Sequence, residues 1–367
     1  MLWTWLSIMN PHRFAWGLAY SAPLAAIAAG VTLLGLMMTK DRQHPFQGTP
    51  ITWLFLFAFW ITLSWLFGMD PSGDYEQWNK VMKIYLMTFV AGMLIINKMQ
   101  IMAFAWVTIG SLAVLGTKGG LFTVLTGGNY RVWGPPGSFI YDNNEFALSL
   151  IMTIPLLHFL QLQMLKAWQK HAFSAAMLLC AAAAIGTYSR GGFLAIAAMS
   201  VMFWLRSSRK GLIGGMLLFA VLVALPMMPE HWWNRMSTIS DYQEDGSAMG
   251  RINAWGVAWE VALHNLFGGG MSYQHDVFFL LYGVHETIVR AAHSIYFQVL
   301  GNHGFVGLFL FLGIWFSTYR VAGWLRKTAR NQEQTEWAAD LGAMVQVSLV
   351  GYAVGGAFLG LSYFDLP

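Results

Sequence analysis

The sequence predicts an all-α fold: a polytopic integral membrane helical bundle with about 10–12 transmembrane helices and one large loop. Only 10% of the residues are charged and 57% are hydrophobic, whereas a soluble domain needs about 25% charged residues. Apolar runs of about 17–25 residues recur along the chain, and each is long enough to cross a hydrocarbon core. Runs such as Leu212–Leu225 do not alternate as barrel strands do, so helices must satisfy the backbone amides in lipid.

Ten apolar runs are long enough to be spans, and we expect residues 1–367 to form a single transmembrane domain. The expected spans are 14–38, 50–68, 80–97, 99–116, 146–163, 172–188, 191–206, 211–226, 295–320 and 339–363. Leu2–Met9 is too short to cross alone and lacks the basic leader of a signal peptide. Because the chain stops at Leu366-Pro367 without a polar tail, we expect the natural protein to continue.

Lysine and arginine residues in the short loops predict the orientation of the chain. They fall in every second loop, at Lys40 and Arg42, Lys98, Lys166 and Lys170, Arg206 to Lys210, and Arg320 to Arg330. Cytoplasmic loops of membrane proteins carry an excess of these residues. Threading the ten spans in order places all these groups on one side, which we expect to be the cytoplasm.

The largest loop, residues 227–294, then faces the side opposite the cytoplasm. Apolar residues around 251–263 have the spacing of an amphipathic helix. Such a helix would rest on the membrane or cap the bundle. The same orientation places Gln243 away from the cytoplasm and Ser208 in it.

The first fragment with chemical potential is Thr187–Gly192, between two apolar spans. Its arginine, Arg190, lies at the edge of the membrane, where an ionisable side chain is costly and often functional. The neighbouring glycines leave room for a ligand. The alternative is an interfacial arginine whose head reaches lipid phosphates.

Two further fragments lie in and after the long loop. Arg251 stands at the expected start of the loop helix, where a guanidinium beside free backbone amides suits a phosphate. The alternative for Arg251 is an exposed loop arginine. His293 stands at the mouth of the next span, where a partly desolvated imidazole suits a general base. The alternative for His293 is a hydrogen bond at a helix start.

Other chemistries find little support in the sequence. The histidines of the long loop lack the spacing of a zinc site, and the single cysteine, Cys180, lies in an apolar run. We therefore expect no metal and no cofactor. No basic run or recognition motif predicts nucleic-acid binding.

The fragments in this order resemble the O-antigen ligase and polymerase superfamily. The nearest resemblance is to the O-antigen ligases, including the O-glycosylation ligases that accompany exosortase systems. It rests on Ser189-Arg190-Gly191 between two spans, Gly250-Arg251 with Trp255 in a long outer loop, His293-Ser294 before the next span, and Gly137–Phe139 with Asp142–Ala147 before a middle span. The resemblance covers about residues 130–310 in motif order.

The resemblance implies a glycosyltransferase of lipopolysaccharide biosynthesis at the periplasmic face of a bacterial inner membrane. The donor would be a glycan linked to undecaprenyl diphosphate, and the acceptor would be lipid A–core. Arg190 and Arg251 match the superfamily's essential arginines, expected to bind the donor diphosphate, and His293 matches its essential histidine. The modest outer loop leaves the choice of acceptor open.

The residues fit this chemistry independently of the family. Two guanidinium groups can neutralise a diphosphate leaving group without metal, while a histidine removes the proton of the attacking hydroxyl. The alternatives with the same donor are an O-antigen polymerase and a protein O-oligosaccharyltransferase. Outside this class, a lipid or solute transporter and a membrane scaffold remain. Nearly charge-free spans, with candidate residues gathered at one face, favour surface chemistry over transport.

Overall fold

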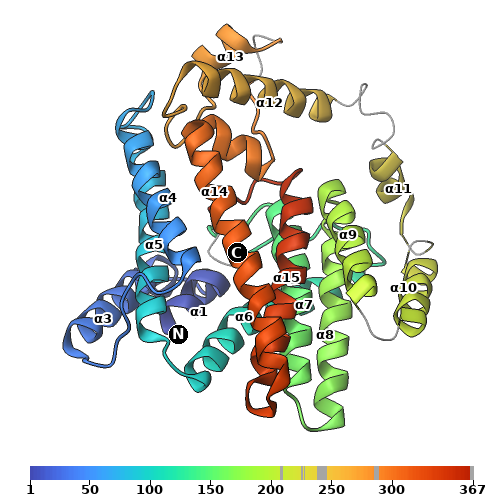
Figure 1. Ribbon diagram of the computed structural model, residues 1–367. Helices are drawn as coiled ribbons and strands as arrows, with labels where there is room; N and C mark the ends of the chain where they lie inside the picture. The colour runs from blue at the N-terminus through green and yellow to red at the C-terminus, as the bar shows by residue number, and fades with distance from the viewer. Residues whose placement is uncertain (207–209, 225, 227, 238–245, 285–288, 364–367) are drawn as a thin grey trace. The chain divides into compact units, whose positions relative to one another are not determined.

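The computed structural model describes residues 1–206, 210–224, 226, 228–237, 246–284 and 289–363, and contains helices, turns and loops but no strand in these ranges (Figure 1). This confirms the predicted all-α fold class. The helices are α1 (Leu2–Met9), η1 (Pro11–Phe14), α2 (Leu18–Ser21), α3 (Leu24–Met38), α4 (Thr49–Leu66), α5 (Tyr75–Leu94), α6 (Lys98–Leu125), α7 (Asn143–Leu162), α8 (Ala167–Gly186), α9 (Arg190–Arg206), α10 (Lys210–Ala224), α11 (Glu230–Ser237), α12 (Gly246–His264), α13 (Asp276–Tyr282), α14 (Ile295–Thr328), η3 (Ala329–Asn331), η4 (Glu333–Thr335) and α15 (Glu336–Gly356).

Within the described ranges, five helices are long and apolar enough to cross a membrane, judged by length and composition. They are Thr49–Leu66, Lys98–Leu125, Asn143–Leu162, Ile295–Asn331 and Glu333–Gly356. Leu24–Met38, Arg190–Leu205 and Lys210–Phe219 are shorter apolar helices. Each of the ten predicted spans overlaps a helix, and the protein is a multi-pass membrane protein. A total of ten to twelve crossings stays a prediction.

Four predicted spans differ clearly from the helices. The span 99–116 is too short, since α6 continues to Leu125. The span 14–38 is interrupted at Ala22, which has an extended ψ of 133°, because the following Pro23 disfavours helical geometry in the residue before it. The span 295–320 is broken at Gly304, where φ is 67° and ψ is −173°. The span 339–363 is too long, since α15 ends at Gly356.

The chain divides into two compact units, each built from separate stretches of sequence. Unit 1 comprises Met1–Ala25, Ala103–Ser240 and Tyr319–Gly356. Unit 2 comprises Ala26–Met102, Asp241–Thr318 and Ala357–Pro367. The single transmembrane domain over residues 1–367 stays a prediction.

In unit 1, α7 packs against α8, α9 and α15, and the four helices run side by side in Figure 1. Most of α7 is buried, and the hydroxyl of Ser348 on α15 donates a 2.9 Å hydrogen bond to the carbonyl of Met152 on α7. Small residues bring α6 and α8 together, since a Cβ at Gly120 would lie 2.0 Å from the carbonyl oxygen of Leu179. Such close approach is typical of helix packing in membranes.

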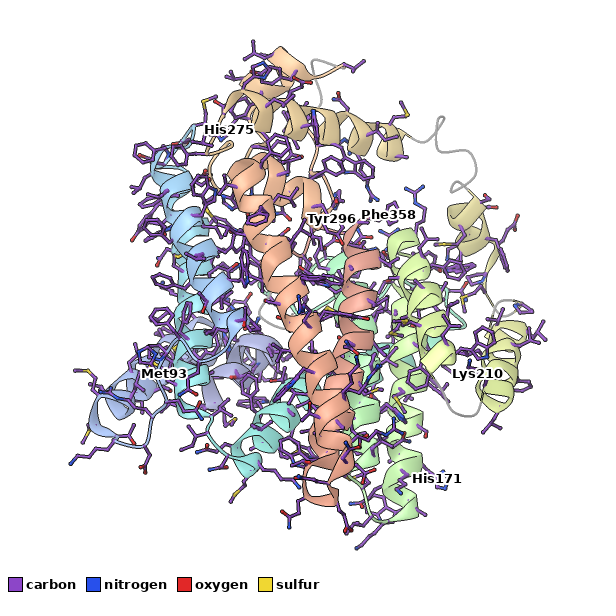
Figure 2. All side chains as sticks on the ribbon, in the orientation of Figure 1. Met93, His171, Lys210, His275, Tyr296 and Phe358 are labelled. Carbon is purple, nitrogen blue, oxygen red and sulfur yellow. The ribbon has the colours of Figure 1, made fainter. Side chains whose placement is uncertain are left out.

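In unit 2, α4 packs against α5 and α12 packs against α13. The C-terminal segment returns to the start of α14, where the Ser362 hydroxyl donates a 2.8 Å hydrogen bond to Oε1 of Gln298. Figure 2 labels Tyr296 and Phe358, one from each of these two segments. The end of the described chain thus supports the segment that follows His293.

Asp74, immediately before α5, connects that helix to the loop after α12. Its buried carboxylate accepts hydrogen bonds from the backbone amides of Met271 at 2.7 Å and Ser272 at 3.3 Å. Burial raises the pKa of the Asp74 carboxyl, and these two hydrogen bonds and the nearby His275 oppose that rise. His275 is labelled in Figure 2.

The predicted long loop, residues 227–294, contains α11, α12 and α13. Gln243 in this loop, and Ser208 before α10, lie outside the described residues. The predicted amphipathic helix at 251–263 is confirmed as part of α12. Its buried face packs on the segment that follows it, through Ala254, Val257, Ala258, Val261, Tyr273, Phe278 and Phe279. Its other face exposes Trp259 and Leu263.

Candidate functional site

Arg190 is the first residue of α9, at the turn that joins α8 to α9. The residue before it, Ser189, caps this helix, because its hydroxyl accepts a 3.1 Å hydrogen bond from the amide of Gly192. The side chain of Arg190 is half-buried. The arginine therefore adds its positive charge to the partially positive N-terminus of a helix, an arrangement that suits an anion.

The start of α7 holds this turn in place. Asn143 donates a 2.8 Å hydrogen bond from Nδ2 to the carbonyl of Thr187, and the Ser189 hydroxyl donates one of 2.8 Å to Oδ1 of Asn144. Asp142 in turn caps α7 by accepting a 2.8 Å hydrogen bond from the Asn144 amide. The motif Asp142–Ala147 and the motif around Arg190, separate in the sequence, are thus bonded to each other.

Tyr188, two residues before Arg190, has an unusual conformation. Its φ of 60° lies in the left-handed region, which costs a bulky residue of order 1–3 kcal/mol. The buried phenol donates a hydrogen bond to the carbonyl of Gly128 and also bonds Nε2 of His231. The Tyr188 and His231 rings stack, with centroids 5.3 Å apart. These contacts offset the backbone strain and hold the turn before Arg190.

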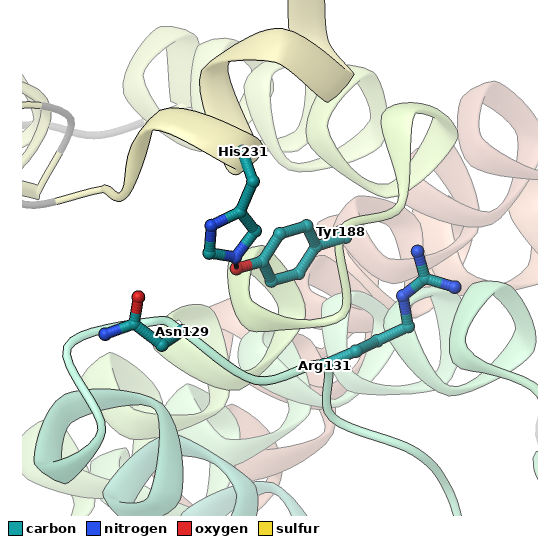
Figure 3. A pocket seen from close by; sticks show the side chains of 4 residues that line it. All are labelled: Asn129, Arg131, Tyr188 and His231. Atoms are coloured by element: carbon teal, nitrogen blue, oxygen red, sulfur yellow. Dashed lines mark hydrogen bonds between the residues drawn. The ribbon is translucent and has the colours of Figure 1, made fainter.

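A cavity of about 260 Å³ opens beside Tyr188 in unit 1 (Figure 3). It is lined by Tyr188 and His231 together with Asn129 and Arg131, which lie in the segment after α6. The sequence motifs do not single out Asn129 or Arg131. Their only signal in the sequence is a polar, aromatic stretch directly after the glycine pair Gly127-Gly128.

Arg251 lies in the second turn of α12, not at its start. The helix begins at Gly246, so the predicted position of Arg251 beside free N-terminal amides is wrong. The apolar spacing begins only near Arg251, so the sequence pattern does not reveal the helical residues that precede it. The side chain of Arg251 is half-buried.

The segment that leads to His293 runs along α12 near Arg251. A Cβ at Gly250 would lie 3.2 Å from Cγ of Arg290, and Nε1 of Trp255 donates a 2.7 Å hydrogen bond to the carbonyl of Ala292. Trp255 also stacks on Phe297 of α14, with ring centroids 5.0 Å apart. Two predicted site residues, Arg251 and His293, are therefore brought onto adjoining segments of unit 2.

His293 stands directly before α14 in a left-handed conformation, with φ of 44°. Its side chain is half-buried, whereas the flanking Ala292 and Ser294 are each 1% exposed. The buried neighbours anchor the backbone on both sides and leave the imidazole partly accessible. That environment suits a group that exchanges a proton with a substrate.

His303, ten residues further along, has a different environment. It is fully buried, and its Nδ1 lies 2.8 Å from the Ser64 hydroxyl and its Nε2 lies 2.7 Å from the Tyr363 hydroxyl. Ser64 donates to the carbonyl of Phe267 at 2.6 Å, so it accepts the hydrogen bond from Nδ1–H of His303. Both ring nitrogens of His303 are therefore engaged in hydrogen bonds inside the packed protein.

The third predicted residue, Arg190, belongs to unit 1, whereas Arg251 and His293 belong to unit 2. Across the described ranges, no group of three His, Cys, Asp or Glu side chains is arranged to hold a metal ion. His285, which shares the long loop, lies outside those ranges. The absence of a metal from the reaction stays a prediction.

These features define the class of protein as a multi-pass membrane protein in which an arginine, Arg190, and a histidine, His293, stand at the N-terminal ends of helices. Residues 175–312 match the family described as O-antigen ligase. This confirms the predicted resemblance to the O-antigen ligase superfamily. The matched stretch contains Arg190, Arg251 and His293, and it supports a glycosyltransferase of the O-antigen ligase or polymerase type.

Residues 1–165 match a second family, which is described as being of unknown function. This stretch contributes Asn129 and Arg131 to the cavity and Asn143 and Asn144 to the support of the α8–α9 turn. No curated protein matches the chain.

Proposed function

We propose that the protein is an O-antigen ligase, which transfers a glycan from undecaprenyl diphosphate to lipid A–core at the periplasmic face of the bacterial inner membrane. The observation that carries the proposal is the position of Arg190 on the capped N-terminus of α9, inside the stretch matched by the O-antigen ligase family. A guanidinium and a helix N-terminus together attract phosphate oxygens.

In the proposed reaction, a hydroxyl oxygen of the acceptor sugar attacks the anomeric carbon of the donor glycan. The bond between that carbon and the diphosphate oxygen breaks, and the electron pair leaves with the diphosphate. Arg190 and Arg251 neutralise the negative charge that develops there. His293 accepts the proton of the attacking hydroxyl. Direct attack from the opposite face inverts the anomeric configuration.

The test is a transfer assay with purified full-length protein and a donor glycan linked to undecaprenyl diphosphate. One reaction contains lipid A–core, and a second contains only more of the lipid-linked glycan. Product on lipid A–core supports the ligase. A lengthened lipid-linked chain without such product would instead identify an O-antigen polymerase.

A third reaction contains lipid A–core and a chelator of divalent cations. Since phosphate neutralisation is assigned to arginines, transfer should continue at an unchanged rate. Loss of transfer that one specific metal restores would contradict the proposed mechanism and assign the charge neutralisation to a bound ion.

A further inference from the structure

The cavity between the segment after α6 and the start of α11 has a size and lining suited to a small polar ligand (Figure 3). Its volume of about 260 Å³ is just below the range of roughly 300–1,000 Å³ found for pockets that hold drug-sized ligands. A single sugar ring with its substituents is of this size class. All four lining residues, Asn129, Arg131, Tyr188 and His231, carry polar groups, and none is acidic.

Arg131 supplies the positive charge of the pocket. Its exposed guanidinium lies 5.6 Å from the centre of the Trp133 ring and 5.9 Å from the centre of the Tyr188 ring. Contact with two aromatic rings restricts the side chain while leaving its N–H donors available. A carboxylate or a phosphate is the group that such a planar fork binds best.

The other side chains supply acceptors. Asn129 donates from Nδ2 to the carbonyl of Thr126 at 2.8 Å, so the amide contributes its Oδ1 to the pocket. The Tyr188 hydroxyl donates to the carbonyl of Gly128 and therefore accepts from Nε2–H of His231. This arrangement makes Nδ1 of His231 an acceptor. These two acceptors, beside the guanidinium of Arg131, suit a sugar ring that carries both hydroxyl groups and an anionic group.

We propose that this pocket binds an anionic sugar unit of the glycan substrate, one that carries a carboxylate or a phosphate. The inference rests on the proposed function for the identity of the larger molecule. Tyr188 and Arg190 are two residues apart, so their Cα atoms are at most about 7 Å from each other. Tyr188 of the pocket and Arg190 thus share the turn between α8 and α9, which favours a sugar unit near the diphosphate assigned to Arg190.

The test measures binding of monosaccharide probes to the purified full-length protein in nanodiscs by saturation-transfer NMR. Methyl β-glucuronide carries a carboxylate, glucose 6-phosphate carries a phosphate, and methyl β-glucoside is neutral. At least one anionic probe should bind about tenfold or more tightly than the glucoside, the usual worth of a hydrogen bond to a charged group. The preferred anionic probe identifies the anion. Equal binding of all three probes, or no binding of any, would overturn the proposal.

Variants locate the binding. Arg131→Gln should weaken binding of the anionic probe about tenfold and leave binding of the glucoside unchanged. Arg330 is exposed and lies outside the pocket, so Arg330→Gln should change the binding of neither probe. Asn129→Ala should weaken the binding of all three probes, because it removes the oxygen that accepts hydrogen bonds from sugar hydroxyl groups. Thermal unfolding checks that each variant is folded. Unchanged affinity for the anionic probe in both pocket variants would place its binding elsewhere and refute the proposal.

Arg190→Lys separates this proposal from the proposed function. The substitution leaves the four lining residues intact, so it should bind the anionic probe as the wild type does while losing glycan transfer. Normal transfer with normal probe binding would contradict the diphosphate assignment and leave the sugar pocket standing. Lost transfer in Arg190→Lys, with no probe binding even in the wild type, would support the diphosphate assignment and refute the sugar pocket.

Discussion

The hydroxyl of Ser189 donates a 2.8 Å hydrogen bond to Oδ1 of Asn144 and accepts a 3.1 Å hydrogen bond from the backbone amide of Gly192. One side chain therefore caps α9 and connects that cap to the start of α7. Because Arg190 is the next residue, the direction of its guanidinium depends on this connection.

Ser189→Ala should lower the free energy of unfolding by about 1 kcal/mol, the usual cost of losing a helix cap. Glycan transfer should fall by roughly 10–10²-fold, since small displacements of a substrate-binding group are costly. Thermal unfolding and the transfer assay measure the two effects. Ser189→Thr keeps the capping oxygen and should retain most activity. Equal activity in Ser189→Ala and wild type would show that the cap does not contribute to catalysis.

The two arginines should tolerate lysine poorly, because lysine keeps the charge but loses the bidentate fork. We expect kcat/KM to fall by roughly 10²–10³-fold in Arg190→Lys and in Arg251→Lys, the usual loss for a group that stabilises developing negative charge. Arg326→Lys, near the end of α14, should transfer normally. Full activity in both site variants would remove the diphosphate-binding hypothesis.

His293→Ala should fold and bind the lipid-linked donor but transfer roughly 10²–10⁴-fold more slowly, the usual worth of a positioned base. The wild-type rate should fall as the pH is lowered, because a protonated imidazole cannot accept a proton. His303→Ala is the control: it removes the hydrogen bonds to Ser64 and Tyr363, so it should unfold at lower temperature yet retain turnover per folded molecule. A fully active His293→Ala with an unchanged pH profile would refute the mechanism.

Asp74 should make the stability of unit 2 depend on pH. Since burial raises the pKa of its carboxyl in the folded state, its contribution to the free energy of unfolding is fully present below about pH 4, the ordinary aspartate value. The contribution is lost as the pH rises through the raised folded pKa. Asp74→Asn should therefore match the wild type in acid and become relatively more stable at higher pH, as measured by thermal unfolding.

Asp74→Ala separates the hydrogen bonds from the charge. Compared with Asp74→Asn, it leaves the amides of Met271 and Ser272 without their acceptor, which should cost about 1–3 kcal/mol at every pH. A stability difference between Asp74→Asn and wild type that does not change with pH would contradict the raised pKa.

The orientation of the chain is testable with single cysteines in a Cys180→Ala background. Cysteines at Asn234, in the long loop, and at Gln332, between α14 and α15, replace exposed side chains. An impermeant thiol reagent added to intact cells should label position 234 and spare position 332 until the membrane is opened. Labelling of both positions from one side would overturn the predicted topology.

The sequence by itself determined the helical membrane class, the approximate spans and the three candidate residues. These features depend on local information: the length of an apolar run, the alternation of basic loops and short motifs such as Ser189-Arg190-Gly191. The same local information predicted continuous spans where the structure has a break before Pro23 and a kink at Gly304, because the residues around both points are apolar. It also placed Arg251 at a helix start, because the apolar spacing begins only near that residue.

Only the tertiary structure decided which side chains from distant segments meet. Ser189 lies 45 residues from its partner Asn144, Tyr188 lies 43 residues from His231, and His303 lies 239 residues from Ser64. No periodicity in the sequence encodes such pairs, since each forms when helices pack and buried polar groups must find partners. For the same reason the sugar-sized pocket around Arg131 and the difference between the half-buried His293 and the fully bonded His303 became visible only in the folded chain.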